Sequence, residues 1–358
     1  MSRLKKVPLG PVMLDIDGLS LTADDKELLQ HPAVNGMILF GRNFESAVQI
    51  DELVKSIRKS RQGLLIAVDH EGGRVQRFRP GFANLPPNAV YGEAYHRNTE
   101  AALEAAEQHA WLIASELQML DIDLAFAPVL DLDYGCSSVI GDRAFHSDPL
   151  TVTMLAKAFL KGLHRGGMAG TGKHFPGHGG VKGDSHLELP VDERTWEVIQ
   201  ATDLQPFIEL AKAGLESVMP AHVVFPAIDS KPAGFSRKWI GEILRQQCQF
   251  DGAAFSDDLS MQGAAETGSY ADRAWASLEA GCDVALVCNN REGAIQIVEA
   301  IGSNPNKFPL LDGLESLQRR LGRLAGKRLS KYDSLNHLQQ SSEYQTAQKN
   351  LNTFMEAQ

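Results

Sequence analysis

Short, unbroken apolar runs recur along the chain, separated by longer stretches with helical spacing. Strands buried on both faces of a parallel sheet have this unbroken apolar character, because helices cover both faces. We therefore predict strands over residues 13–18, 36–40, 64–70, 124–130, 169–175, 217–225, 252–259 and 284–289. Strands that alternate with helices in this way predict an α/β fold.

The stretches between these runs carry helix signals. Residues 103–120 place apolar side chains at spacings of three and four, which predicts a helix with one apolar stripe. Ser147-Asp148-Pro149 offers a capping side chain followed by a proline, which is a common way to start a helix. Further helices are expected over residues 45–61, 192–213, 236–249, 270–281, 291–303 and 311–329.

The number of strand–helix units favours a single-domain (β/α)8 barrel of the TIM type, with a doubly wound open sheet as the alternative. Nearly every apolar run ends in carboxylate, histidine or basic side chains, such as Asp69 near the end of the third run and Asp257 near the end of the seventh. Barrel enzymes build their sites at this end of their strands, so the distribution favours the barrel. We expect a catalytic domain over residues 1–335 and a polar C-terminal tail, helical or frayed, over residues 336–358.

Composition and charge exclude several classes of protein. The 358-residue chain is 43% hydrophobic and 22% charged, as in a globular protein with a large core. The formal net charge of −10 disfavours nucleic-acid binding, and Arg319, Arg320 and Arg323 are expected to form a solvated helix face. No apolar stretch has the length of a membrane span or a signal peptide, so we expect a cytoplasmic protein without membrane partners. The four cysteines form no Cys-x-x-Cys pair, which argues against a zinc knuckle.

The densest group of chemistry-bearing residues is the segment 173–186, KHFPGHGGVKGDSH, at the end of the fifth apolar run. It contains three histidines, one aspartate and four glycines. Three interpretations carry equal weight from the residues alone. The segment could hold a metal, it could form an acid/base site in which Asp184 orients His186, or its histidines could only stabilise the loop by hydrogen bonds.

Other segments combine acidic and basic residues. Residues 255–259, FSDDL, place two carboxylates at the end of the seventh run, where one could act as a nucleophile and the other could accept backbone N–H bonds. Neighbouring strand residues point in different directions, so we do not expect these two to act as a pair. Residues 69–77, DHEGGRVQR, and 141–145, GDRAF, could bind hydroxyl groups or could be loops fixed by internal Asp–Arg pairs.

In this order, DHEGGRVQR, GDRAF, KHFPGHGGVKGDSH, MPAHV and FSDDLSM resemble the motifs of glycoside hydrolase family 3, especially its bacterial single-domain β-N-acetylhexosaminidases. The resemblance covers roughly residues 10–300, and His70 stands where this branch often has glutamine. It implies a retaining exo-β-N-acetylglucosaminidase acting on GlcNAc-1,6-anhydro-MurNAc peptides in peptidoglycan recycling, and thereby a part in cell-wall biogenesis, cell shape and cell division.

The resemblance also implies roles residue by residue. Asp257 matches the nucleophile, and His186 matches the acid/base with Asp184 as its partner; a histidine near neutral pKa can both donate and accept the proton. The N-acetylglucosamine would be held by Asp69, Arg77, Arg143, Lys173 and His174. His178 is expected to support the loop. We expect no cofactor, a small carbohydrate substrate as partner, and a monomer.

Two alternatives stay open. A metal-dependent barrel hydrolase would use His174, His178, His186 and His222 as ligands, and chelation would abolish its activity. A sugar-binding protein with an inactive site would bind N-acetylglucosaminides without hydrolysing them.

Overall fold

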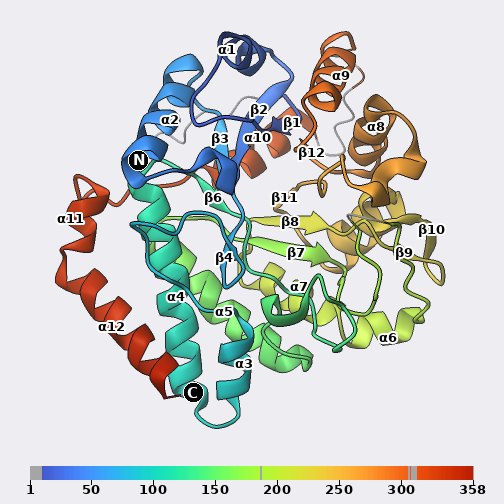
Figure 1. Cartoon of the computed structure of the whole chain (residues 1–358). Helices are drawn as coiled ribbons and strands as arrows, with labels where there is room; N and C mark the ends of the chain where they lie inside the picture. The colour runs from blue at the N-terminus through green and yellow to red at the C-terminus, as the bar shows by residue number, and fades with distance from the viewer. Residues whose placement is uncertain (1–9, 186–187, 305–306, 308–312, 358) are drawn as a thin grey trace.

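The computed structural model describes residues 10–185, 188–304, 307 and 313–357. Parallel strands lie at the centre of the molecule and helices lie around them (Figure 1). Each predicted apolar run overlaps one of these strands, which confirms the α/β fold. Most strands are shorter than their runs, although the second strand is longer and the first two strands begin before their runs do. They are β1 Val12–Leu14, β2 Val34–Leu39, β3 Leu65–Val68, β6 Leu124–Ala125, β7 Thr171–Phe175, β8 Ser217–Pro220, β11 Ala253–Ala254 and β12 Ala285–Val287.

The order of the central strands follows the chain. β1 pairs with β2, β2 with β3, β3 with β6, β7 with β8 and β8 with β11, all in parallel. Isolated parallel bridges join Leu124 to Ala169 between the segments of β6 and β7, and Phe255 to Val284 between those of β11 and β12. β12 then pairs in parallel with β1, so the last central strand lies beside the first.

Two short antiparallel ladders stand at the carboxyl ends of central strands. β4 His70–Gly72 pairs with β5 Val75–Gln76 just after β3, and β9 Val224–Phe225 pairs with β10 Asp229–Pro232 after β8. The first ladder contains most of the DHEGGRVQR segment. It therefore turns the residues that follow Asp69 back over the end of the sheet.

Helices occupy the intervals between the strands, and in places their bounds differ from the predicted ones. They are α1 Ala23–Gln30, α2 Ala47–Ser60, α3 Ala89–Tyr95, α4 Thr99–Met119, α5 Pro149–Arg165, α6 Trp196–Ala201, α7 Leu204–Lys212, α8 Tyr270–Ala280, α9 Arg291–Gly302, α10 Gly313–Leu324, α11 Leu335–Gln339 and α12 Ser342–Glu356. Short 3₁₀ turns are η1 Gly41–Asn43, η2 Gly141–Arg143, η3 Ala233–Phe235 and η5 Gln262–Thr267, and η4 Lys238–Gln247 is a π-helix.

The helix start predicted at Ser147-Asp148-Pro149 is confirmed, because Asp148 caps α5 by accepting from the backbone N–H of Thr151. The single helix predicted over 192–213 is wrong, since α6 and α7 are separate. Thr202 leaves helical geometry between them, and Pro206 lacks the N–H that would bond to the Thr202 carbonyl in a continuous helix.

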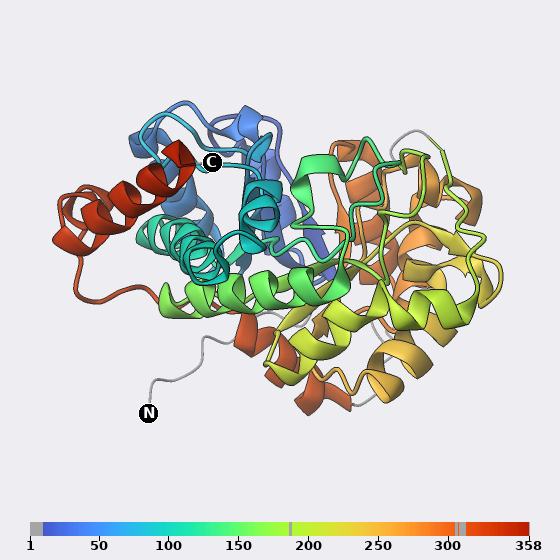
Figure 2. The same ribbon diagram turned by 90° about the horizontal axis from the view of Figure 1, so that it is seen from below.

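Helix α4 is buried on more than the one stripe that its pattern predicts. Every residue from His109 to Met119 is buried. The reason is that α5 and α3 pack against it together with the C-terminal helices α11 and α12, which lie along its outer side (Figures 1 and 2). The described part of the tail over 336–358 thus lies mostly in α11 and α12, which supply part of the cover of α4.

Helix α10 packs against the central strands. Its residues Leu317, Leu321 and Leu324 share a hydrophobic cluster with strand residues such as Met13 and Leu286. The expectation of a solvated basic face is wrong for Arg320, because this side chain is only 5% exposed and its Nη2 lies 2.8 Å from Asp283 Oδ1. A buried carboxylate needs such a partner to offset the loss of its water.

The cysteines that the structure describes, Cys136, Cys248, Cys282 and Cys288, are free thiols. The helices in the ranges given above also fall short of the combined length and apolar character that a membrane crossing requires.

Candidate active site

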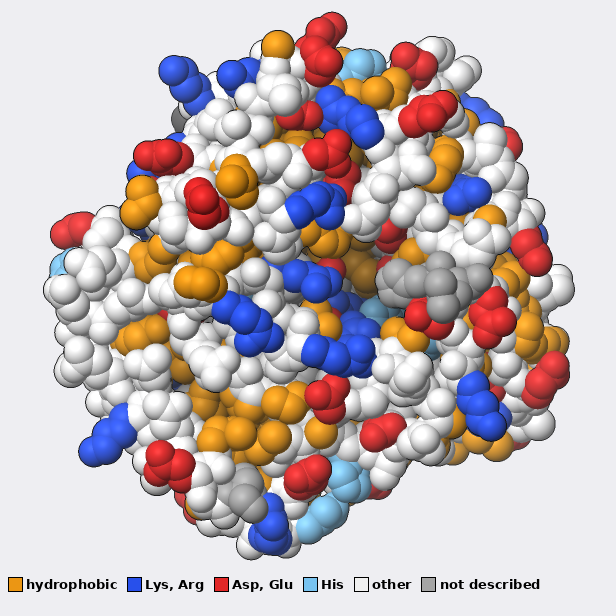
Figure 3. Space-filling model, in the orientation of Figure 1, with side chains coloured by type: hydrophobic (Ala, Val, Ile, Leu, Met, Phe, Trp, Pro, Cys, Tyr) orange, Lys and Arg blue, Asp and Glu red, His pale blue; other side chains and the backbone are white. Residues whose placement is uncertain are grey.

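A cavity of about 790 Å³ lies at the carboxyl ends of the parallel strands. In the space-filling view it is a hollow near the middle of one face, with Lys and Arg side chains gathered around it (Figure 3). The structure brings together in its lining the sequence-predicted residues Asp69, Arg77, Arg143, Lys173, His174, Asp184 and Asp257. His186 lies outside the described residues.

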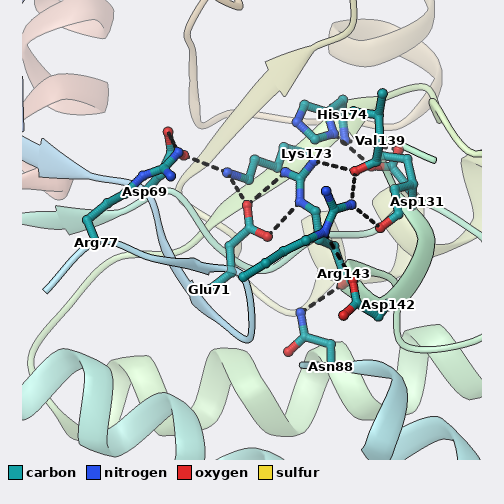
Figure 4. Close-up of polar contacts among 12 residues, drawn as sticks. Asp69, Glu71, Arg77, Asn88, Asp131, Val139, Asp142, Arg143, Lys173 and His174 are labelled. Carbon is teal, nitrogen blue, oxygen red and sulfur yellow. Dashed lines mark hydrogen bonds and ion pairs between the residues drawn. The ribbon is translucent and has the colours of Figure 1, made fainter. Parts of the chain in front are cut away.

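The buried Lys173, in the middle of β7, connects two carboxylates of the cavity. Its Nζ lies 2.8 Å from Asp69 Oδ1 and 2.7 Å from Glu71 Oε1 (Figure 4). Arg143 binds the same Glu71 with both Nε and Nη2, at 2.9 and 2.8 Å. Burial alone would raise the pKa of Glu71, but Arg143 and Lys173 hold it well below its usual value. Glu71 is therefore an ionised anchor that fixes both cations.

Asp69 faces two cations as well. Besides Lys173, Arg77 approaches it with Nη2 at 3.8 Å from Oδ2. Burial would raise the pKa of Asp69, whereas these two cations lower it below its usual value. An ionised carboxylate accepts hydrogen bonds and donates none, so Asp69 suits the hydroxyl groups of a bound sugar.

Asp131, which follows β6, positions His174 and His178, the two described histidines of the 173–186 segment. Its Oδ2 lies 2.7 Å from His174 Nδ1, and its Oδ1 accepts from the backbone N–H of His178 at 2.7 Å. The engagement of Nδ1 leaves Nε2 of His174 for a bound molecule. His178 Nε2 also lies 3.1 Å from Ser185 Oγ, which agrees with its interpretation as a support of the loop.

The two carboxylates after β11, Asp257 and Asp258, have different roles. Asp258 Oδ1 accepts from the backbone N–H groups of Ser260 and Cys288 at 2.9 and 3.0 Å, and its Oδ2 accepts from Ser260 Oγ at 2.7 Å. Asp258 is thus the carboxylate that holds the following turn. Asp257 lines the cavity, and its role as the nucleophile stays a prediction.

Sequence reasoning assigned no role to Glu71 and Asp131, although both follow buried apolar runs just as Asp69 does. It considered internal Asp–Arg pairs in residues 69–77 and 141–145 as the alternative to hydroxyl binding. Asp69 and Arg77 form such a pair within the first loop. Two further pairs join the loops to each other: Arg143 binds Glu71, and Arg74 Nε lies 3.2 Å from Asp142 Oδ1. A partner in another loop leaves no spacing signal in the sequence.

Of the histidines proposed as metal ligands in the metal-hydrolase alternative, His174 and His178 lie side by side, with ring centroids 6.1 Å apart, whereas His222 makes other contacts. His222 Nε2 lies 3.1 Å from the carbonyl oxygen of Asp258, and its ring stacks on Phe235. Over the described residues, no three side chains of His, Cys, Asp or Glu are placed to hold one metal ion.

His70 makes stability depend on pH beside the site. Its ring is buried against Phe78 and Phe82, and burial lowers its pKa from 6.5 to about 3. Between pH 6.5 and about pH 3, His70 is protonated in the unfolded chain but stays neutral in the folded chain. The contribution of His70 is therefore intact above pH 6.5 and declines as the pH falls toward 3.

We predict that His70→Leu removes part of this acid sensitivity. At about pH 4.5 the variant should avoid a loss of about 3 kcal/mol in unfolding free energy, because a leucine has no proton to bind. His109, whose pKa burial also lowers to about 3, remains in both proteins. Urea unfolding at about pH 7 and about pH 4.5 measures the difference. Variant His337→Leu, at an exposed position, is the control, and an unchanged acid loss in His70→Leu would contradict the prediction.

Residues 7–308 match the family model described as the glycosyl hydrolase family 3 N-terminal domain. The chain belongs to glycoside hydrolase family 3. A β-hexosaminidase of Tolumonas auensis is 55% identical over 299 residues, covering 83% of this chain and 88% of that protein. A β-hexosaminidase of Chromobacterium violaceum is 52% identical over 322 residues, covering 90% of this chain and 88% of that protein.

Solved structures of this family agree with the fold. NagZ from Neisseria gonorrhoeae, in complex with N-trifluoroacetyl-D-glucosamine, is 43% identical, with a TM-score of 0.87 over 97% of this chain and 98% of that one. A family 3 β-N-acetylglucosaminidase from Paenibacillus is 30% identical, with a TM-score of 0.84 over 99% of this chain and 69% of that one. The protein is a glycoside hydrolase with β-hexosaminidase activity.

Proposed function

We propose that the protein is a retaining exo-β-N-acetylglucosaminidase that releases terminal β-linked N-acetylglucosamine from GlcNAc-1,6-anhydro-MurNAc peptides. The observation that carries this proposal is the cavity itself, where Asp257 and Asp184 line the same space as five residues suited to hold a sugar. The complex of the Neisseria gonorrhoeae relative with N-trifluoroacetyl-D-glucosamine supports the class of sugar.

In the proposed reaction, Asp257 attacks the anomeric carbon and forms a covalent glycosyl-enzyme. His186 gives a proton to the departing oxygen and later takes one from the water that hydrolyses the intermediate. Asp184 stabilises the imidazolium form of His186, which is present before the first proton transfer and is regained after the second; between these steps the imidazole is neutral. Two successive displacements at one carbon leave the anomeric configuration unchanged.

The sugar would be held by the ion-paired group. Asp69 would accept hydrogen bonds from hydroxyl groups, and Lys173, Arg77 and His174 would donate to the sugar. Arg143 already uses Nε and Nη2 on Glu71 and Nη1 on the carbonyl of Val139, so it would contribute only its remaining N–H groups.

We also propose that the strands close into a (β/α)8 barrel within a catalytic domain over residues 1–335, with residues 336–358 as an appended helical tail. The pairing of the last central strand with the first supports the closure. On this proposal the enzyme is a cytoplasmic monomer that recycles cell-wall fragments, without nucleic-acid or membrane partners.

A panel of aryl glycosides tests the proposal. We expect the N-acetyl-β-glucosaminide to be cleaved in preference to the β-glucoside and the N-acetyl-β-galactosaminide, with activity unchanged by EDTA. Equal rates across the panel would reject the sugar assignment. Loss of activity with EDTA that added metal restores would favour the metal-dependent alternative, and binding without turnover would favour the inactive one.

A further inference from the structure

The loop that carries Asp184 leaves β7 against a first wall formed by residues 132–136. Gly179 is pressed onto this wall, because a Cβ at that position would lie 1.7 Å from the carbonyl oxygen of Leu132. The thiol of Cys136 also donates to the Gly179 carbonyl, with Sγ and O 3.2 Å apart. A side chain at position 179 would therefore displace the loop.

The second wall consists of two charged side chains, Arg194 and Asp203. A Cβ on Gly177 would lie 2.6 Å from Asp203 Oδ1, and a Cβ on Gly180 would lie 2.3 Å from Arg194 Nη2. Gly177 also has a φ of +148°, which side-chain-bearing residues rarely adopt. The glycines of the motif thus let the backbone touch these charged groups directly.

A network of ion pairs makes this second wall rigid. Arg194 Nη1 lies 2.8 Å from Asp203 Oδ2, and on its other side Arg194 Nη2 lies 2.6 Å from Asp192 Oδ2. Both aspartates are buried. Tyr134 donates its hydroxyl to Asp203 Oδ2 at 2.8 Å, and the guanidinium of Arg194 stacks over the Tyr134 ring. Because Tyr134 belongs to residues 132–136, the two walls are fixed to each other.

Contacts within the loop carry this placement onward to Asp184. His178, between the clamped glycines, has its Nε2 3.1 Å from Ser185 Oγ. The Ser185 carbonyl accepts from the backbone N–H of Gly263 at 2.9 Å. Asp184 lies directly before Ser185 and lines the cavity. A shift of residues 177–180 would therefore move Asp184 relative to the departing group.

We propose that Arg194 and Asp203 are positioning residues for the proton-transfer step, because they clamp the base of the loop that carries Asp184. The inference rests on the proposed function, in which His186 of the same loop protonates the leaving group. Asp257 stands on a different segment, after β11, and would keep its place. Loosening the clamp should therefore slow the cleavage of glycosides whose leaving group needs protonation. It should have little effect on glycosides whose leaving group departs as an anion.

The test compares two N-acetyl-β-glucosaminides, one with a dinitrophenyl group, which leaves without protonation, and one with a phenyl group, which needs it. For Arg194→Met we expect kcat/KM on the phenyl substrate to fall at least about tenfold further than on the dinitrophenyl substrate. Arg194→Lys, which keeps a charge beside Asp203, should recover part of the difference. Gly180→Ala, which crowds the guanidinium and leaves no buried charge unpaired, should shift the ratio in the same direction, so the test does not depend on Arg194→Met folding.

Arg320→Met is the matched control, because Arg320 also forms a buried ion pair with an aspartate but lies on α10, away from the loop. It should lower the melting temperature and leave the ratio of the two rates unchanged. Equal losses on both substrates in Arg194→Met and Gly180→Ala would overturn the inference. His186→Ala, measured in parallel, distinguishes a failure of the clamp hypothesis from a failure of the proposed function. Equal losses of kcat/KM on both substrates in His186→Ala would reject His186 as the acid/base residue.

Discussion

Replacing Asp257 with alanine is expected to lower kcat on N-acetylglucosaminides by a factor on the order of 10⁴ or more while the protein stays folded. Without the carboxylate no covalent intermediate forms, and water would have to attack in a cavity shaped for two successive displacements. The structural cost is small, because among the described residues the carboxylate accepts one hydrogen bond, from the backbone N–H of Asp258. Steady-state rates and melting curves of the purified variant give both quantities.

Asp258→Asn is the matched control for this prediction. Asp258 holds the turn through Ser260 and Cys288, so its amide should lower the melting temperature and retain far more activity than Asp257→Ala. A folded Asp257→Ala protein with more than about a hundredth of the wild-type kcat would contradict the assignment of the nucleophile. Greater loss of kcat in Asp258→Asn would exchange the roles of the two carboxylates.

Replacing His186 with alanine should reduce kcat/KM on GlcNAc-1,6-anhydro-MurNAc by about 10²- to 10⁴-fold, the usual contribution of a general acid. The alcohol oxygen of this substrate departs only when protonated. A dinitrophenol departs as an anion, so the same variant should cleave the dinitrophenyl N-acetylglucosaminide with a much smaller loss in kcat/KM. The ratio of the two losses is the quantity to measure.

His222→Asn is the control for His186→Ala. His222 is buried beside Phe235 and is not among the residues that line the cavity, so its replacement should affect stability without favouring either substrate. Equal losses on both substrates in His186→Ala would show that the histidine is not the general acid. The residue that does protonate the leaving group would then be sought among the other groups of the cavity.

The strands could be predicted because burial on both faces leaves an unbroken apolar run, and the candidate site because polar side chains follow those runs. Most runs overestimate strand length: residues 252–259 contain β11 of only Ala253–Ala254, since Phe255 already makes an isolated bridge and Asp258 belongs to a turn. The break between α6 and α7 was visible only in Pro206, because the residues around it keep a helical pattern.

Ion pairs between residues far apart in the chain could not be predicted from the sequence, because the fold alone brings the partners together. Arg320 has the sequence neighbourhood of a surface arginine, but the buried Asp283, brought beside α10 by the fold, stabilises its buried charge. Glu71 is likewise defined by Lys173 and Arg143, which lie far away in the chain. Without its partners, a carboxylate gives no sign of whether it anchors other side chains or binds a ligand.

The most direct test of the account is to trap the glycosyl-enzyme. A 5-fluoro derivative of N-acetylglucosaminyl fluoride carries a good leaving group and slows the hydrolysis of any covalent intermediate, so the sugar should remain attached to the protein. Peptide mass mapping then locates it. The account predicts one added sugar on the peptide that contains Asp257 and none in Asp257→Ala. A sugar on another residue, or turnover of the compound without any labelled peptide, would contradict it.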